Sequence, residues 1–385
     1  MPFGGTISWL ETLGLKYKIK LFCGNVQCYK FLNYSNFSHL EVTHMKAVVY
    51  EGPREFSITE VTIPTPDPNQ VLIKVATCGV CKTDVHIHNG EFLAEFPLTP
   101  GHEFAGEVVQ VGTQVADVQL GDRVVVDNTI LCGHCYYCKR SQPLYCKNFY
   151  SLGVNRPGGF AEYVVANHDK VFSIGSLSFD EAAMIEPTSC AIHGMDVIDL
   201  RPGDDVLMFG TGPTGIVLAQ LLRYCGASNL VIVGSDPVKL DLVGRLARAD
   251  TIQMDRSHYD VHTQELMKKY PEGFDVVIDA TGAVQVLQQC PKFTKFGGKI
   301  VVYGVTHESD TITLSPYEIF HKELKILGSF AQTHCFDRAI KYLQLGLVNV
   351  KGIISHRFHL DQFNEALEQV STGKGHVKVI VDMRQ

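Results

Sequence analysis

Short apolar runs separated by glycine, proline and aspartate dominate the chain from residue 45 to about residue 195. Examples are Val71–Ala76, Gly106–Val111, Arg123–Val126 and Ala161–Val165. Short strands joined by turn residues are typical of a compact antiparallel β domain. We therefore predict a β-rich domain over this first part of the chain.

The pattern changes at Asp205, where strand-like and helix-like segments begin to alternate. The expected strands are Val206–Gly210, Leu230–Val233, Asp275–Asp279 and Lys299–Tyr303, and the expected helices are Gly215–Cys225 and Lys239–Ala249. Such alternation predicts a parallel doubly wound sheet, which we place in residues 196–335. An amphipathic helix at 336–345 and a strand-like run at 377–381 follow, and the pattern alone assigns them to neither domain.

Residues 1–44 differ from the rest of the chain, because they hold the single tryptophan, no arginine and no clear periodicity. They are either a mitochondrial presequence or an upstream segment from an over-long gene model, with Met45 as the true start. Presequences are rich in arginine and serine and poor in acidic residues, so the composition favours the second interpretation.

Composition narrows the class of protein. The 385 residues carry a formal net charge of −7, which argues against nucleic-acid and anionic-membrane partners, because these need clustered Lys and Arg. No run reaches the roughly 18 apolar residues of a membrane span. Twelve cysteines without a visible secretory segment favour metal binding in a reducing compartment. We expect a cytoplasmic globular protein, or a mitochondrial one if residues 1–44 are a presequence.

Four cysteines lie close together, with gaps of two, two and seven residues: Cys132, Cys135, Cys138 and Cys146. Four thiolates at this spacing can close a tetrahedral site around Zn²⁺, with no open position, which is typical of a structural zinc. Unrelated buried cysteines, two disulfides and an iron–sulfur cluster are the alternatives, and the cluster is the strongest of them.

A second set of candidate metal ligands consists of Cys81, His102, Glu103 and Glu186. A catalytic zinc needs a few such ligands and an open position for water or substrate. Spacing alone does not separate this hypothesis from a buried cysteine and histidine with solvent-facing carboxylates.

A glycine-rich turn follows the first expected strand of the doubly wound sheet: Gly210, Thr211, Gly212, Pro213, Thr214 and Gly215. Between a strand and a helix this GxGxxG pattern predicts a dinucleotide site, with the pyrophosphate at the helix N-terminus.

The residues about 20 positions further on decide how the cofactor ribose is bound. An NAD enzyme carries an acidic residue at the end of the second strand, where this chain has Gly234 followed by Ser235 and Asp236, with Lys239 nearby. The small residue, the hydroxyl and the lysine suit a 2′-phosphate and favour NADP. Alternatively, Asp236 binds the ribose as in NAD enzymes.

Over residues 45–385 these motifs together resemble the zinc-containing medium-chain alcohol/polyol dehydrogenase family. The resemblance is carried by the block from Gly79 to His86, by Gly101-His102-Glu103, by the four-cysteine loop and by Gly121-Asp122-Arg123-Val124. It implies a GroES-like β-rich catalytic domain (45–195 and 336–385), a Rossmann domain (196–335), one catalytic and one structural zinc, and a homodimer or homotetramer.

Roles follow from the same resemblance. Cys81, His102 and Glu103 match metal positions, and Glu186 stands where the polyol and threonine branches carry a glutamate. Asp84 matches a carboxylate that orients the metal-bound histidine. Thr83 and His86 match a proton relay, so that the alcohol loses its proton beside a Lewis-acidic zinc and its hydride passes to the nicotinamide.

The substrate is inferred from departures within the family. Asp127-Asn128-Thr129 lacks the histidine of threonine dehydrogenases, and Ala331 stands where sorbitol dehydrogenases carry an arginine. The chain most resembles the D-arabinitol dehydrogenases of fungi, which implies a small-molecule polyol, a pentitol such as D-arabinitol. The alternatives are an L-threonine-type amino-alcohol dehydrogenase and a non-catalytic, crystallin-like nucleotide-binding relative.

Overall fold

The computed structural model describes residues 20–23, 26–29, 43–373 and 375–384. The chain forms two units, Met1–Thr43 and His44–Gln385. In the first unit, β1 (Lys20–Cys23) pairs with β2 (Val26–Tyr29) in an antiparallel hairpin. Most of segment 1–44 lies outside the described residues, so the presequence and the upstream-segment interpretations both stay untested.

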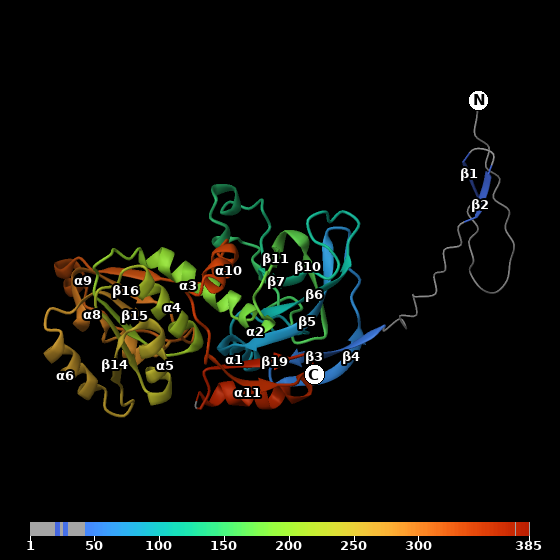
Figure 1. Ribbon diagram of the computed structural model, residues 1–385. Helices are drawn as coiled ribbons and strands as arrows, with labels where there is room; N and C mark the ends of the chain where they lie inside the picture. Colours follow the sequence, from blue (N-terminus) through green and yellow to red (C-terminus); the bar gives the residue numbers. More distant parts are fainter. Residues whose placement is uncertain (1–19, 24–25, 30–42, 374, 385) are drawn as a thin grey trace. The chain divides into compact units, whose positions relative to one another are not determined.

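The first half of the second unit is built on a seven-stranded sheet centred on β5 (Gln70–Val80). The order is β11-β7-β6-β5-β19-β18, with β10 also paired to β5. The other strands are β6 (Glu103–Val111), β7 (Arg123–Val126), β10 (Tyr163–Asn167), β11 (Val171–Ser173), β18 (Ile354–Phe358) and β19 (Lys378–Asp382). Strand β19 pairs antiparallel with β5, so the end of the chain returns to this sheet (Figure 1).

Smaller elements complete this half. Hairpins form between β3 (His44–Gly52) and β4 (Glu55–Thr62), and between β8 (Thr129–Ile130) and β9 (Tyr150–Ser151). The helices are α1 (Lys82–His88), α2 (Phe179–Ala182), α3 (Ile185–Ile198), α10 (Phe336–Gln344) and α11 (Phe363–Thr372).

The expected parallel doubly wound sheet is confirmed. Its strands are β12 (Val206–Phe209), β13 (Leu230–Gly234), β14 (Asp250–Gln253), β15 (Phe274–Asp279), β16 (Thr294–Val302) and β17 (Lys325–Gly328). They run in the order β14-β13-β12-β15-β16-β17 and all pair in parallel. The order reverses between β12 and β15, where such folds bind dinucleotides.

Helices cover this sheet: α4 (Pro213–Tyr224), α5 (Pro237–Ala247), α6 (Tyr259–Lys269), α7 (Val284–Leu287), α8 (Cys290–Phe293) and α9 (Pro316–Lys322). In the described ranges, no helix has both the length and the apolar character needed to cross a membrane.

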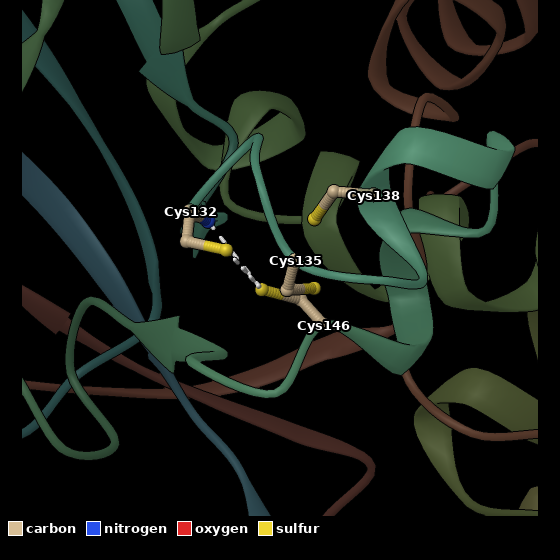
Figure 2. A group of neighbouring side chains, drawn as sticks. All are labelled: Cys132, Cys135, Cys138 and Cys146. Carbon is tan, nitrogen blue, oxygen red and sulfur yellow. Dashed lines mark hydrogen bonds between the residues drawn. The ribbon is translucent and has the colours of Figure 1, made fainter.

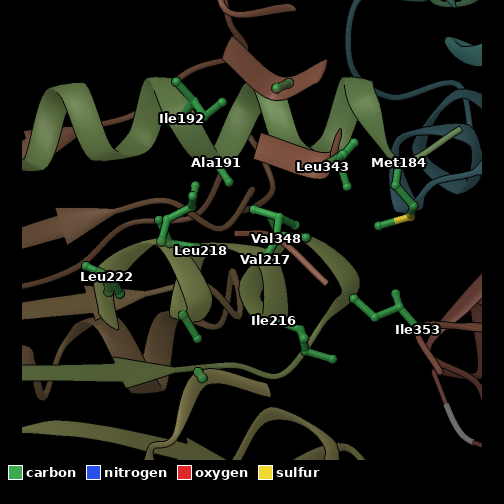
Figure 3. Close-up of a cluster of buried hydrophobic side chains, with 14 of the residues drawn as sticks. Met184, Ala191, Ile192, Ile216, Val217, Leu218, Leu222, Leu343, Val348 and Ile353 are labelled. Atoms are coloured by element: carbon green, nitrogen blue, oxygen red, sulfur yellow. The ribbon is translucent and has the colours of Figure 1, made fainter. Parts of the chain in front are cut away.

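One hydrophobic core reaches across both halves of the second unit. Helix α3 lies against α4 and α10, and Figure 3 shows Ala191 and Ile192 of α3 near Val217 and Leu218 of α4. The same cluster contains Val125 of the first sheet and residues of the second sheet, all almost fully buried. Helix α3 therefore joins the two sheets, and it begins beside the candidate active site.

Candidate active site and metal centres

Sheet pairing brings three candidate ligands together. Cys81 precedes α1 at the end of β5, and Glu103 begins β6, directly after His102. The antiparallel pairing of β5 with β6 places Gly79 opposite Glu103. As a result, one ligand atom each from Cys81, His102 and Glu103 lie within 4.8 Å of one another.

Asp84 supports this group from behind. Its Oδ2 accepts a hydrogen bond of 2.8 Å from the Cys81 backbone N–H, and its Oδ1 lies 3.6 Å from His102 Nδ1. Burial by itself lowers the pKa of His102, but the Asp84 carboxylate outweighs burial and raises this pKa well above its usual value. A carboxylate facing Nδ1 also favours the tautomer that leaves Nε2 free for a metal.

Glu103 has a buried partner that the sequence analysis missed. Lys378 of β19 forms an ion pair with Glu103 Oε2, and both side chains are about 2% exposed. Burial by itself lowers the pKa of Lys378, but Glu103 together with Cys81 and Asp84 raises this pKa above its usual value. Gly79 makes room, since a Cβ there would collide with both side chains. The available signal was a single lysine at the start of the final strand, followed by three apolar residues.

Glu186 lies beside this group but is not joined to it within 4.8 Å. It occupies the first turn of α3, and its Oε1 accepts a weak hydrogen bond from the Cys190 thiol at 3.4 Å. Burial raises the pKa of Glu186 to about 7, while the neighbouring His102 charge acts in the opposite direction. A cation bound among these side chains would hold the carboxylate in its charged form.

The donor set fits a zinc ion. A thiol, an imidazole and carboxylates are the ligands that Zn²⁺ takes in catalytic sites, where one position stays open. Three of these donors converge, and a carboxylate orients the imidazole. A divalent cation would relieve the electrostatic strain of a half-buried thiol next to acidic groups.

The four cysteines of the 132–146 loop also converge. One sulfur atom from each lies within 4.8 Å of the others, and Cys132 Sγ is 3.5 Å from Cys146 Sγ (Figure 2). Backbone N–H groups of Cys138 and Lys147 lower the pKa of the Cys135 thiol to about 6. All four are free thiols, so the alternative of two disulfides is not borne out. This arrangement fits a tetrahedral metal site with no open position.

The two expected relay residues lie on α1. Thr83 Oγ1 is 3.6 Å from Cys81 Sγ, and His86 Nδ1 forms a 2.6 Å hydrogen bond with Glu91 Oε2. Glu91 was missed by the sequence analysis, although it follows His86 by only five residues. His86 Nε2 is buried and has no partner among the described residues.

A cavity of about 200 Å³ opens beside this histidine. It is lined by His86, Gly90, Glu91 and Phe92 from the α1 side and by residues 305–308 after β16. The cavity therefore lies between the α1 segment and the loop after β16, next to the candidate proton relay.

The glycine-rich turn has the expected strand–turn–helix geometry. Gly210 follows β12 with φ +114°, and a Cβ there would meet the backbone of Ala280. Gly212 is the N-cap of α4 and Pro213 begins the helix. Gly215 packs against the Gly210 carbonyl, so helix and strand approach closely.

Asp236 has a structural role at the start of the next helix, α5. Its Oδ1 caps α5 by accepting hydrogen bonds from the backbone N–H groups of Val238 (2.9 Å) and Lys239 (3.3 Å). Gly234 ends β13 against the Thr211 side chain, where a Cβ would be too close. Burial lowers the pKa of Lys239, and the charge of nearby Arg256, another residue that sequence reasoning missed, lowers it further.

Comparison with known protein families agrees with this geometry. Residues 67–176 match the alcohol dehydrogenase GroES-like domain, and residues 213–345 match the zinc-binding dehydrogenase model. A D-arabinitol dehydrogenase of Uromyces fabae is 43% identical over 85% of this chain and 94% of its own length. The chain belongs to the zinc-binding alcohol dehydrogenase family.

Other members of the zinc-binding alcohol dehydrogenase family extend the comparison. An L-threonine 3-dehydrogenase of Pectobacterium carotovorum is 34% identical over 86% of this chain and 97% of its own length. A zinc-binding dehydrogenase of Sinorhizobium meliloti, solved with NADP, superimposes with a TM-score of 0.83 at 32% identity, covering 88% of this chain and 99% of its own. An Escherichia coli alcohol dehydrogenase solved with NADH gives 0.82 at 28% identity, covering 89% and 100%.

This membership confirms the predicted GroES-like plus Rossmann fold and the enzyme class, a zinc-binding dehydrogenase with a nicotinamide cofactor.

Within this family fold, the loop after β17 reaches the first half of the unit. Gln332 Nε2 donates a 2.8 Å hydrogen bond to Asp127 Oδ1, and Ala331 adopts φ +47° beside it.

Proposed function

We propose that this enzyme oxidises a secondary alcohol of a polyol, a pentitol such as D-arabinitol, to a ketose with NADP. The observation that carries the proposal is the convergence of Cys81, His102 and Glu103 where β5 ends and β6 begins, with Asp84 behind the imidazole. The similarity to a D-arabinitol dehydrogenase supports the pentitol.

In the proposed mechanism, Cys81, His102, Glu103 and Glu186 would hold the catalytic zinc. When bound, Zn²⁺ supplies Lewis acidity that favours loss of the alcohol proton at neutral pH. Asp84 fixes the orientation of the His102 ring.

The proton then needs a path to solvent. Thr83 Oγ1, beside the Cys81 thiol, receives the alcohol proton while passing its own onward, and His86 takes it toward the cavity. Glu91 holds the His86 ring through its 2.6 Å hydrogen bond. The glycine-rich turn at 210–215 positions the nicotinamide cofactor that accepts the hydride.

We propose two zinc ions per chain, the second held by Cys132, Cys135, Cys138 and Cys146. Four donors without an open position support a structural role. The thiols bind metal only when reduced, which supports a reducing compartment such as the cytoplasm.

The preference for NADP rests on the ribose end of the site. Asp236 is engaged in capping α5, while Ser235, Lys239 and Arg256 offer a hydroxyl and two cations. We expect Lys239→Ala and Arg256→Ala each to raise KM for NADP about tenfold or more and to leave KM for NAD within twofold. Asp236→Asn keeps the cap. A large rise in KM for NAD in Asp236→Asn would assign the ribose contact to Asp236 instead.

The proposed catalytic domain is 45–195 with 336–385, and the proposed Rossmann domain is 196–335. The return of β18 and β19 to the first sheet supports this division.

We also propose a homo-oligomer. Strand β17 is an open edge of its sheet, and nearby Phe320, Tyr317 and Phe296 are 79%, 71% and 68% exposed.

The deciding experiment measures initial rates with NADP and NAD over pentitols, hexitols and L-threonine. Pentitol-dependent NADPH formation that disappears in Cys81→Ala is the expected result. The matched control, Cys78→Ala, removes a buried thiol outside the metal group and should retain activity. Activity only with threonine would favour the amino-alcohol alternative, and cofactor binding without turnover would favour the crystallin-like one.

A further inference from the structure

Tyr303 lies at the junction of the two halves, directly after β16. Its backbone N–H donates a 3.0 Å hydrogen bond to the Asp279 carbonyl, which fixes the end of the strand. Its ring packs against Gly194 of α3. A Cβ at position 194 would lie 2.8 Å from Tyr303 Cε2 and 3.2 Å from Cδ2, so the ring occupies the space that glycine leaves.

The face of α3 under this ring leads to the metal group. Glu186, Cys190 and Gly194 follow one another at intervals of four residues and therefore share one side of the helix. The Tyr303 pKa is raised well above its usual value, first by burial and then by the charges of Cys190, Glu186 and Cys81. The Tyr303 ring on Gly194 therefore shares the helix face that carries Cys190 and Glu186.

The Tyr303 hydroxyl is buried and has no hydrogen-bond partner among the described residues. A buried hydroxyl without a partner is unfavourable, and such groups are usually satisfied by another group or by a ligand. The neighbouring Glu186 carboxylate is already hydrogen-bonded to the Cys190 thiol. The phenol is thus an unpartnered donor on the helix face that carries Glu186.

A polyol has a second hydroxyl that this donor can recognise and that a simple alcohol lacks. The carbon next to the reacting carbinol also carries a hydroxyl, and a rigid phenol can donate to its oxygen. A site built to bond a substrate hydroxyl discriminates strongly against analogues that lack it, because its own polar group is then left unpaired.

We propose that Tyr303 is a specificity-determining residue whose hydroxyl donates a hydrogen bond to the substrate hydroxyl adjacent to the reacting carbon. This inference rests on the proposed polyol function. It requires no change in the metal ligands or in the dinucleotide site.

The test uses zinc-loaded Tyr303→Phe, which keeps the ring on Gly194 and removes only the hydroxyl. For D-arabinitol we expect kcat/KM to fall about 10- to 100-fold, mainly through KM. For butan-2-ol, which has no second hydroxyl, we expect less than a twofold change. Zinc content and the NADPH dissociation constant, measured by fluorescence titration, should equal those of the wild type.

Two further variants keep the inference falsifiable. Gly194→Ala retains the hydroxyl but displaces the ring, and should show the same selective loss. Tyr270→Phe removes a hydroxyl that is bonded to Asp250 elsewhere in the molecule, and should leave both substrates unaffected.

Four outcomes would overturn the inference. Equal losses with D-arabinitol and butan-2-ol would show a general structural role, and weaker NADPH binding would place the hydroxyl on the cofactor. An unchanged Tyr303→Phe in an enzyme that oxidises pentitols would refute the inference alone. A wild-type enzyme inactive on every polyol would refute the proposed function and the inference with it.

Discussion

The carboxylate of Glu103, at the start of β6, is ion-paired with the ammonium group of Lys378, at the start of β19, and both are almost completely buried. The two strands that flank β5 thus hold a cation against one member of the metal group. Before a metal ion binds, the Lys378 charge compensates the Glu103 carboxylate beside the Cys81 thiol.

Removing the cation should be costly. Lys378→Met leaves the Glu103 carboxylate buried without a partner, and breaking such a pair lowers the free energy of unfolding by about 3–5 kcal/mol. Urea denaturation of the metal-loaded protein measures this loss. Lys378→Arg, which retains the charge, should lose much less, and a Lys378→Met variant as stable as the wild type would contradict the account.

The four-cysteine loop should hold its own metal ion. Cys135→Ser should reduce zinc, measured by elemental analysis, from two ions per chain to one, and should lower the melting temperature. The control is Cys225→Ser, at the end of α4 and outside both metal groups. Iron in place of zinc in the wild type would instead support the iron–sulfur alternative.

Glu91 should matter for turnover more than for binding. Glu91→Gln removes the carboxylate that orients His86, and we expect kcat for alcohol oxidation to fall about tenfold, the lower end of the effect of losing an orienting carboxylate. The NADPH dissociation constant should not change. Glu308→Gln lines the same cavity without bonding to His86, and an equal loss in that variant would argue against orientation.

Stability at acid pH should depend on Asp180. Hydrogen bonding to Arg357 lowers the Asp180 pKa, so its contribution is fully present above the usual carboxyl pKa of about 3.9 and is lost as pH falls through the lower folded value. Asp180→Asn should cost about 1 kcal/mol at pH 7, a modest value because Arg357 is 43% exposed. The difference from the wild type, followed by urea denaturation, should shrink toward pH 2–3, and a constant difference would refute the linkage.

Local spacing explains what could be predicted from the sequence. The Gly210–Gly215 turn and the four-cysteine loop need only nearby residues to define their geometry, so their residues could be identified from the order of amino acids alone. The grouping of Cys81 with His102 also followed, although there it depended on family resemblance rather than on spacing.

The features that escaped prediction depend on strand pairing between distant segments. Lys378 meets Glu103 because β19 pairs with β5 and β5 with β6, a register that no local pattern encodes. Tyr303 meets α3 only through the packing of the two halves. For Asp236 the sequence left two cofactor roles open and did not indicate that the side chain also caps the helix that follows it.

The continuous core around α3 has a consequence for how the molecule comes apart. Since Val125 of one sheet and Met208 of the other belong to the same buried cluster, neither sheet can lose its packing without exposing the other. The unit from His44 to Gln385 should therefore unfold in a single cooperative transition. Damage at the cysteine loop should also reduce the protection of amide hydrogens from exchange in the distant parallel sheet.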